Sequence, residues 1–149
     1  MTVGFVCSSG GHLTQLYWLK PFWEKHDRFW VTFDTVDARN LLVGERVYWA
    51  FHPTNRSLGN LLRNARIAGR ILSREGPEVL ISNGAGVAVP FFYWGKFLNI
   101  PLVFIEVYDR IDTPSVTGQL VAPLADRVIL QWEEQREHYP EGTFMGTIR

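Results

Sequence analysis

Short apolar runs and longer stretches with helical periodicity alternate along the whole chain. The apolar runs predict β-strands at residues 2–7, 29–34, 46–51, 78–82, 101–106, 126–131 and, more weakly, 143–146. The periodic stretches predict helices at 13–25, 36–43, 57–75, 87–98, 115–124 and 133–138. Pro21 falls inside the first helical stretch, where a proline kinks or ends a helix. This alternation predicts an α/β domain with a mainly parallel sheet.

Composition narrows the class of protein. The 149 residues suit one domain, 1–149, that buries its own core without disulfides or metal. Fifteen basic and fifteen acidic residues cancel, so nothing indicates a nucleic-acid partner. The single cysteine, Cys7, cannot form an internal disulfide, which is typical of the cytoplasm. We expect neither a signal peptide nor a transmembrane span, because the first strand begins at residue 2 and no apolar run is long enough.

The first strand runs directly into a glycine loop at residues 8–12, which contains Ser9, Gly10, Gly11 and His12. A strand, a glycine turn and a helix N-terminus together suit phosphate or another anion. The spacing matches neither a dinucleotide fingerprint nor a P-loop. His12 at the mouth of the loop either caps the following helix or acts as a base or ligand-binding donor.

A second glycine loop, with Asn83, Gly84 and Gly86, follows the fourth predicted strand. Ligands of such sheets bind beyond the carboxyl ends of the strands, so segments 8–12, 52–56, 83–86 and 106–113 should share one edge. One glycine loop is weak support for an anion site, whereas two in one sheet favour a site for a diphosphate.

Glu106 ends the apolar run at 102–105, so its carboxylate should emerge at the same edge. There it could act as a base, orient His12 or hold a sugar hydroxyl. The alternative is a charged strand end paired with Arg110, on a segment that could itself line the cleft.

Two segments suggest contact with a membrane surface. The helix at 57–75 carries a basic stripe without interrupting acids, formed by Arg63, Arg66, Arg70 and Arg74. The first helix carries more large apolar groups than one core-facing stripe requires, among them Trp18, Phe22 and Trp23. The alternatives are a solvated charged face for the arginines and a protein partner for the aromatic groups.

Together these motifs resemble a known family, the acceptor-side subunits of two-part glycosyltransferases. That family includes the eukaryotic subunit that anchors the transferase adding the second GlcNAc to dolichol diphosphate, and bacterial PssD- and EpsF-type exopolysaccharide proteins. The matching segments are residues 8–13, 81–90, 105–106, 115–118, 123–132, 139–140 and 145–146. A more distant likeness links the glycine loops and the strand-end glutamate to the N-terminal half of MurG-type enzymes.

The resemblance implies one Rossmann-like domain, equivalent to the N-terminal half of an inverting, metal-independent GT-B glycosyltransferase without cofactors. It implies a donor-binding partner chain for the UDP-sugar, and a lipid-diphosphate-linked sugar as acceptor. His12 would be the base, with Glu106 orienting it or replacing it. The acceptor or its diphosphate would contact Ser9, Gly10, Gly11, Asn83, Gly84, Gly86 and Arg110. We therefore expect a cytoplasmic protein, peripheral on the inner face of the cell membrane, in exopolysaccharide or capsule synthesis.

Two other functions remain open at this point. The chain could be a non-catalytic scaffold that recruits and stabilises the catalytic partner at the membrane. A nucleotide-cofactor oxidoreductase is disfavoured, because the dinucleotide fingerprint is missing.

Overall fold

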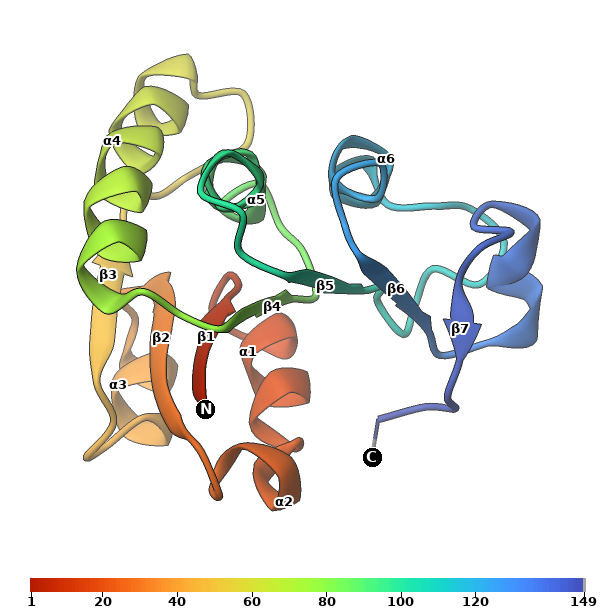
Figure 1. Cartoon of the computed structure of the whole chain (residues 1–149), viewed down its shortest axis with the longest axis horizontal. Coiled ribbons are helices and arrows are strands. Elements are labelled where there is room, and N and C mark those ends of the chain that lie inside the picture. Colours follow the sequence, from red (N-terminus) through yellow and green to blue (C-terminus); the bar gives the residue numbers. More distant parts are fainter. Residues whose placement is uncertain (149) are drawn as a thin grey trace.

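The computed structural model describes residues 1–148 and shows one seven-stranded sheet in the order β3-β2-β1-β4-β5-β6-β7 (Figure 1). Every pair of neighbouring strands is parallel. The strands are β1 (Thr2–Val6), β2 (Asp27–Phe33), β3 (Val47–Ala50), β4 (Val79–Ser82), β5 (Leu102–Ile105), β6 (Arg127–Leu130) and β7 (Thr143–Phe144). The predicted α/β class and parallel sheet are confirmed.

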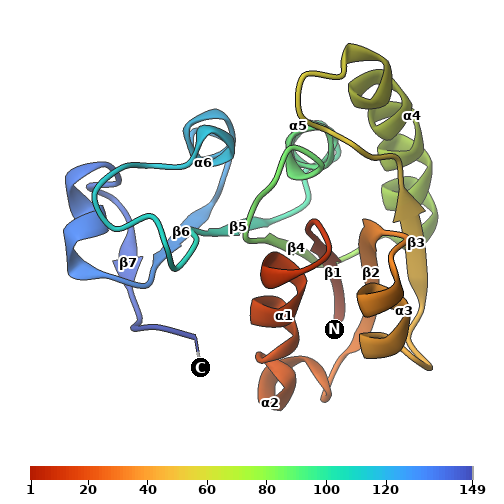
Figure 2. The ribbon, with the colours of Figure 1, turned by 180° about the vertical axis from the view of Figure 1, so that it is seen from behind.

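Helices cover both faces of this sheet, as Figures 1 and 2 show. The helices are α1 (Gly11–Tyr17), α2 (Lys20–Trp23), α3 (Val36–Leu41), α4 (Leu58–Glu75), α5 (Ala88–Phe97), α6 (Val116–Val121) and the 3₁₀ helix η1 (Glu133–Glu137). Buried residues of α4, α5 and α6 pack in one apolar core, and those of α1, α2 and α3 pack in a second core. The sheet therefore separates two helical layers.

The helix expected at 13–25 is two helices, α1 and α2, and Pro21 lies in the first turn of α2. A proline is tolerated at that position because its missing N–H would have no partner inside the helix. The break turns Trp23 into the core, where it is 2% exposed and packs edge-on against Trp30 with ring centroids 5.6 Å apart. The prediction that Trp23 contacts a membrane surface is therefore wrong.

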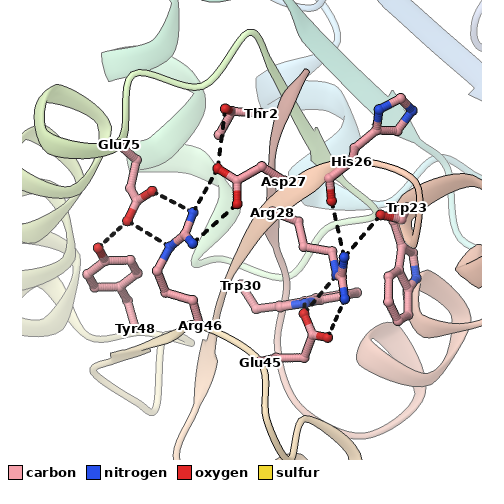
Figure 3. A network of polar contacts seen from close by, with 10 residues as sticks. All are labelled: Thr2, Trp23, His26, Asp27, Arg28, Trp30, Glu45, Arg46, Tyr48 and Glu75. Atoms are coloured by element: carbon pink, nitrogen blue, oxygen red, sulfur yellow. Dashed lines mark hydrogen bonds and ion pairs between the residues drawn. The ribbon is translucent and has the colours of Figure 1, made fainter.

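Ion pairs join the strands at the edge of the sheet opposite the glycine loops (Figure 3). Arg28 donates two hydrogen bonds to the carboxylate of Glu45, at 2.8 and 2.7 Å, and Trp30 Nε1 donates a third at 3.0 Å. Arg46 bridges Asp27 at the start of β2 and Glu75 at the end of α4. These contacts fasten β2 to the segment before β3 and to α4.

Burial opposes ionisation of Glu45, but the hydrogen bonds from Arg28 and Trp30 outweigh it and hold the pKa of this carboxyl below its ordinary value. The Arg28–Glu45 pair is largely shielded from solvent, with side-chain exposures of 24% and 14%. The pair therefore contributes to stability wherever Glu45 is ionised.

We expect Glu45→Gln to lower the free energy of unfolding by about 2 kcal/mol at pH 7, as measured by urea denaturation. The stability that an ionised Glu45 contributes is present above the unfolded pKa, ~4.3, and is lost as pH falls through its lower folded pKa. The difference between the two proteins should therefore vanish in acid. Asp34→Asn, which alters a solvent-exposed pair with Arg39, is the control and should leave the midpoint unchanged. A pH-independent difference would contradict this account.

Candidate functional site

A cleft of about 590 Å³ opens at the carboxyl edge of the sheet. Its walls come from the loops after β1, β3, β4 and β5, which are far apart in sequence. Because all the strands are parallel, their carboxyl ends meet at this edge. The segments that the sequence assigned to one edge therefore line a single cleft.

His12 is held at this cleft by two hydrogen bonds with Asn83. The imidazole Nδ1 lies 3.2 Å from the carbonyl oxygen of Asn83, and the Asn83 amide Nδ2 donates to the carbonyl of His12 at 2.8 Å. A carbonyl oxygen only accepts, so Nδ1 carries the proton and Nε2 keeps its lone pair. The two glycine loops thus fix the tautomer that a general base requires.

The surroundings of His12 also keep the ring neutral. Burial lowers the pKa of His12 below its ordinary value, and this effect outweighs the hydrogen bonds with Asn83 and the charges of Asp109 and Glu106, which act in the opposite direction. An imidazole with a lowered pKa is unprotonated at neutral pH. His12 is therefore able to accept a proton from a group in the cleft.

The helices that begin at this edge differ in how their N-termini are capped. Helices α3, α4 and α6 are capped by the hydroxyls of Thr35, Ser57 and Ser115. Helices α1 and α5, which follow the two glycine loops, have no side-chain cap. Uncapped amides and the positive end of a helix dipole attract an anion.

The first of these two uncapped ends already meets a carboxylate of the protein. Gly10, at φ 80°, donates its N–H to Asp37 Oδ2 at 2.9 Å. Hydrogen bonds, first from Thr35 and then from the Gly10 amide, hold the pKa of Asp37 below its ordinary value. The Gly10 amide is therefore taken, and Asp37 places negative charge where the sequence predicted phosphate.

The second glycine loop lines the cleft just before α5, whose first amides, those of Ala88 and Val89, donate to the carbonyls of Ala85 and Gly86 at 3.0 and 3.3 Å. The Gly84 amide donates to Ser82 Oγ at 3.0 Å, and Asn83 is fully buried. Ala85 and Gly86, which precede α5, line the cleft together with Arg110. On the opposite loop, Ser8 rather than Ser9 lines the cleft, and Gly11 borders a smaller hollow on the other side of His12.

Glu106 does not reach the cleft. Its side chain is fully buried, and its carboxylate accepts hydrogen bonds from the amides of Val107 and Ser115, at 2.8 and 3.0 Å, and from the hydroxyl of Tyr139. No hydrogen bond or ion pair within residues 1–148 joins it to His12 or Arg110. In the described part of the chain the Glu106 carboxylate is thus bonded to other groups than His12, and its role as the base or as the residue that orients His12 stays a prediction.

Sequence reasoning missed two residues that shape the cleft, Asn60 and Asn64 of α4. Asn60 Nδ2 donates to the carbonyl of Pro53 at 2.7 Å, and Asn64 bonds both the amide and the carbonyl of Phe51. These contacts hold the wall formed by the loop at 51–57. The sequence did hold a signal that could have identified these two residues. They are spaced four residues apart on the buried, otherwise apolar face of a helix.

The side chains expected at a membrane surface lie in two different layers. The predicted arginines of α4 are all exposed, and they lie on the same side of the sheet as α5 (Figure 1). Trp18 and Phe22, which are 50% and 39% exposed, belong to the α1–α2 region of the opposite layer. The sheet lies between the two groups. Among residues 1–148, no helix is long and apolar enough to cross a bilayer.

Comparisons with known sequences agree on one family. The model of the family described as "Oligosaccharide biosynthesis protein Alg14 like" matches residues 52–148. The UDP-N-acetylglucosamine transferase subunit ALG14 of Eremothecium gossypii is 28% identical over 112 residues, which cover 71% of this chain and 50% of that protein. The Homo sapiens subunit of the same name is 30% identical over 84 residues, covering 52% and 39%. The chain thus spans about half the length, or less, of these relatives.

Comparisons with solved structures define the fold. MurG of Acinetobacter baumannii aligns with a TM-score of 0.80 and 16% identity over 99% of this chain and 46% of its own. A UDP-GlcNAc 2-epimerase of Neisseria meningitidis aligns with a TM-score of 0.81 and 12% identity over 99% and 47%. These matches confirm the expected fold, a Rossmann-like half of a GT-B glycosyltransferase.

We expect the NMR titration midpoint of His12 to lie below 6.5, with Nδ1 protonated in the neutral form. Asp109→Asn should lower that midpoint further, because it removes a negative charge that favours the imidazolium. Asp112→Asn, on the same loop, is the control and should leave the midpoint unchanged. A midpoint at or above 6.5, or a proton on Nε2, would contradict the proposed state of the ring.

Proposed function

The chain belongs to the Alg14-like family of oligosaccharide biosynthesis proteins, and from this premise we propose that it is the acceptor-binding subunit of a two-component glycosyltransferase. In this proposal, a separate partner chain binds a UDP-sugar, and this chain holds a lipid-diphosphate-linked saccharide. The relatives named as UDP-N-acetylglucosamine transferase subunits support this reading, as does a fold that matches less than half of MurG. The likeness of its glycine loops to bacterial exopolysaccharide proteins supports a place in exopolysaccharide or capsule synthesis.

The observation that carries the proposal is the neutral His12, with its Nε2 lone pair free. As the acceptor hydroxyl attacks the anomeric carbon, its proton passes to Nε2 of His12. The new bond joins the acceptor oxygen to the anomeric carbon, and the bond from that carbon to the UDP oxygen breaks with its electron pair. UDP leaves from the face opposite the attack, so the configuration inverts. No metal or cofactor enters these steps.

The acceptor's diphosphate is unchanged in this reaction and needs only a binding site. We assign it to the start of α5, where Ala85 and Gly86 line the cleft and the helix has no side-chain cap. The guanidinium of Arg110, on another wall of the same cleft, supplies a positive charge. The first glycine loop, whose Gly10 amide is bonded to Asp37, instead positions His12.

Contact with the membrane is assigned to the outer side of α4 and α5, hereafter the α4–α5 surface. Its exposed apolar residues are Leu58, Leu62, Tyr93 and Phe97, and its arginines are Arg63, Arg66, Arg70 and Arg74. Apolar groups beside cations suit a surface of anionic lipid. The α4 helix also begins directly after the loop at 51–57, a wall of the cleft, so a membrane-bound lipid on this surface lies next to the site. In this proposal the protein is peripheral on the inner face of the cell membrane.

The first test is transfer from a UDP-sugar to a synthetic lipid-diphosphate sugar, with this chain, a donor-binding partner chain from the same organism, and both together. We expect activity only in the mixture. His12→Ala should lower the rate of the mixture by about 10²–10⁴-fold, because the base is lost. His26→Ala, at the opposite edge of the sheet, is the control and should retain the wild-type rate. If the partner alone matches the pair, the chain is a scaffold and His12 is not the base.

The membrane contact is tested by flotation with phosphatidylcholine vesicles, with and without phosphatidylglycerol. We expect binding that requires the anionic lipid. Changing Arg66 and Arg70 together to Gln should weaken it about 30-fold, since each arginine near such a surface contributes about 1 kcal/mol. Leu62→Ser should also weaken binding, whereas Phe22→Ser in the opposite layer should not. If Phe22→Ser weakens binding and Leu62→Ser does not, the membrane contact lies on α1 and α2 instead.

A further inference from the structure

A segment outside the cleft, residues 131–139, holds one of its walls through side-chain hydrogen bonds. The wall is formed by residues 106–115, hereafter the cleft loop, which contains Asp109 and Arg110. Gln131 Nε2 donates to the carbonyl of Glu106 at 3.0 Å, and Trp132 Nε1 donates to that of Tyr108 at 2.7 Å. His138 Nε2 lies 2.6 Å from the carbonyl of Asp112.

Gln135 is the centre of this arrangement. Its Nε2 donates to the carbonyls of Val107 and Arg110, at 3.1 and 2.9 Å. Its Oε1 accepts from the amides of Gln131 and Trp132, at 2.8 and 3.2 Å. The residue is 1% exposed, and both of its donors and both lone pairs of its oxygen are used. A buried amide with every hydrogen bond satisfied fixes the two segments relative to each other.

The buried carboxylate of Glu106 anchors the two ends of the cleft loop. It accepts from the amide of Val107, next to it, and from the amide and hydroxyl of Ser115, at the other end. Tyr139, at the end of the 131–139 segment, donates its hydroxyl to the same carboxylate, and burial raises the pKa of that hydroxyl. A Cβ at position 118 would lie 2.1 Å from the Tyr139 hydroxyl and 2.7 Å from Glu106 Oε2, so any other residue there would force these bonded side chains to move.

We propose that Gln135, with its neighbours in the 131–139 segment, is a positioning residue for acceptor binding. None of the described residues of this segment lines the cleft, so the segment acts through the cleft loop. The residue that the segment positions is Arg110, because Gln135 donates a hydrogen bond directly to its carbonyl. This inference rests on the proposed function, because it gives Arg110 the diphosphate of the acceptor as its ligand.

The two loops of the site then make different contributions to the kinetics. His12 is held by Asn83, in a loop that Gln135 does not contact, so loss of Gln135 leaves these hydrogen bonds in place. Displacing Asp109 with the cleft loop would weaken a charge that raises the pKa of His12, so the ring stays neutral. Arg110 contacts the acceptor before as well as during the reaction. A displaced cleft loop should therefore raise the KM for the acceptor and leave kcat and the KM for the UDP-sugar nearly unchanged.

Two opposite substitutions on η1 test this positioning role. Both are made in this chain and assayed in complex with its donor-binding partner. Gln135→Glu keeps the size of the side chain and its accepting oxygen, but at neutral pH it cannot donate to the two carbonyls. We expect the KM for the lipid-diphosphate sugar to rise about tenfold, and amide hydrogen exchange at residues 107–113 to become faster. Glu134→Gln makes the reverse change at an exposed neighbour and should alter neither quantity.

Three outcomes separate the possibilities. A wild-type pair without transfer would overturn the proposed function, while faster exchange of the cleft loop in the Gln135 variant would still support its positioning role. If the Gln135→Glu variant is active, and both its KM for the acceptor and its amide exchange are unchanged, the positioning role is overturned but the proposed function is not. If Gln135→Glu fails to fold, Trp132→Phe is the second variant: it removes the bond to the Tyr108 carbonyl and reduces the ring that packs on Tyr108. It should raise the acceptor KM by a smaller factor, and an unchanged KM would again overturn the inference.

Discussion

Parallel pairing of β1 with β4 is the constraint on which the site depends. Val3, Gly4, Phe5 and Val6 pair in register with residues 79–82, so both strands end at the same edge although some seventy residues of sequence separate them. Only this pairing brings His12 within 3.2 Å of the Asn83 carbonyl. The tautomer of the ring follows from that contact, and the burial that comes with it lowers the pKa of His12 although the hydrogen bonds with Asn83 act in the opposite direction. Sheet topology, rather than a local motif, places His12 and Asn83 together, and our proposal that His12 is the base rests on this placement.

The two glycine loops have different roles despite their similar sequences. The Gly10 amide meets the Asp37 carboxylate, so the first loop is neutralised within the protein and carries His12. The helix after the second loop, α5, has no side-chain cap, and we assign the acceptor's diphosphate to the residues before it, Ala85 and Gly86, which line the cleft. Asn83 of this second loop also holds His12, whereas Arg110 is held separately by Gln135. The separate support of Arg110 explains why the proposed loss of Gln135 affects binding of the acceptor more than the chemical step.

Local signals predicted the strands to within about two residues, because apolar runs and turn-forming residues are encoded nearby in sequence. Long-range contacts determine which side chains face the core and which face the cleft, and these directions could not be predicted from the sequence. The break at Pro21 was visible, but which aromatic group then faces the core was not, and Trp23 was misplaced. The position of Glu106 at a strand end was predicted correctly, yet its direction is decided by Tyr139, which lies 33 residues away. Gln135 gave no local signal at all.

The central claim is that this chain binds the acceptor, and its most direct test uses the chain alone. An isotopically labelled sample would be titrated with a short-chain polyprenyl diphosphate bearing GlcNAc and, separately, with UDP-GlcNAc. We expect the lipid diphosphate to shift the amide signals of Ala85 and Gly86 and the ring signals of His12, and UDP-GlcNAc at the same concentration to leave them unchanged. Shifts of these signals by UDP-GlcNAc but not by the lipid diphosphate would contradict the claim.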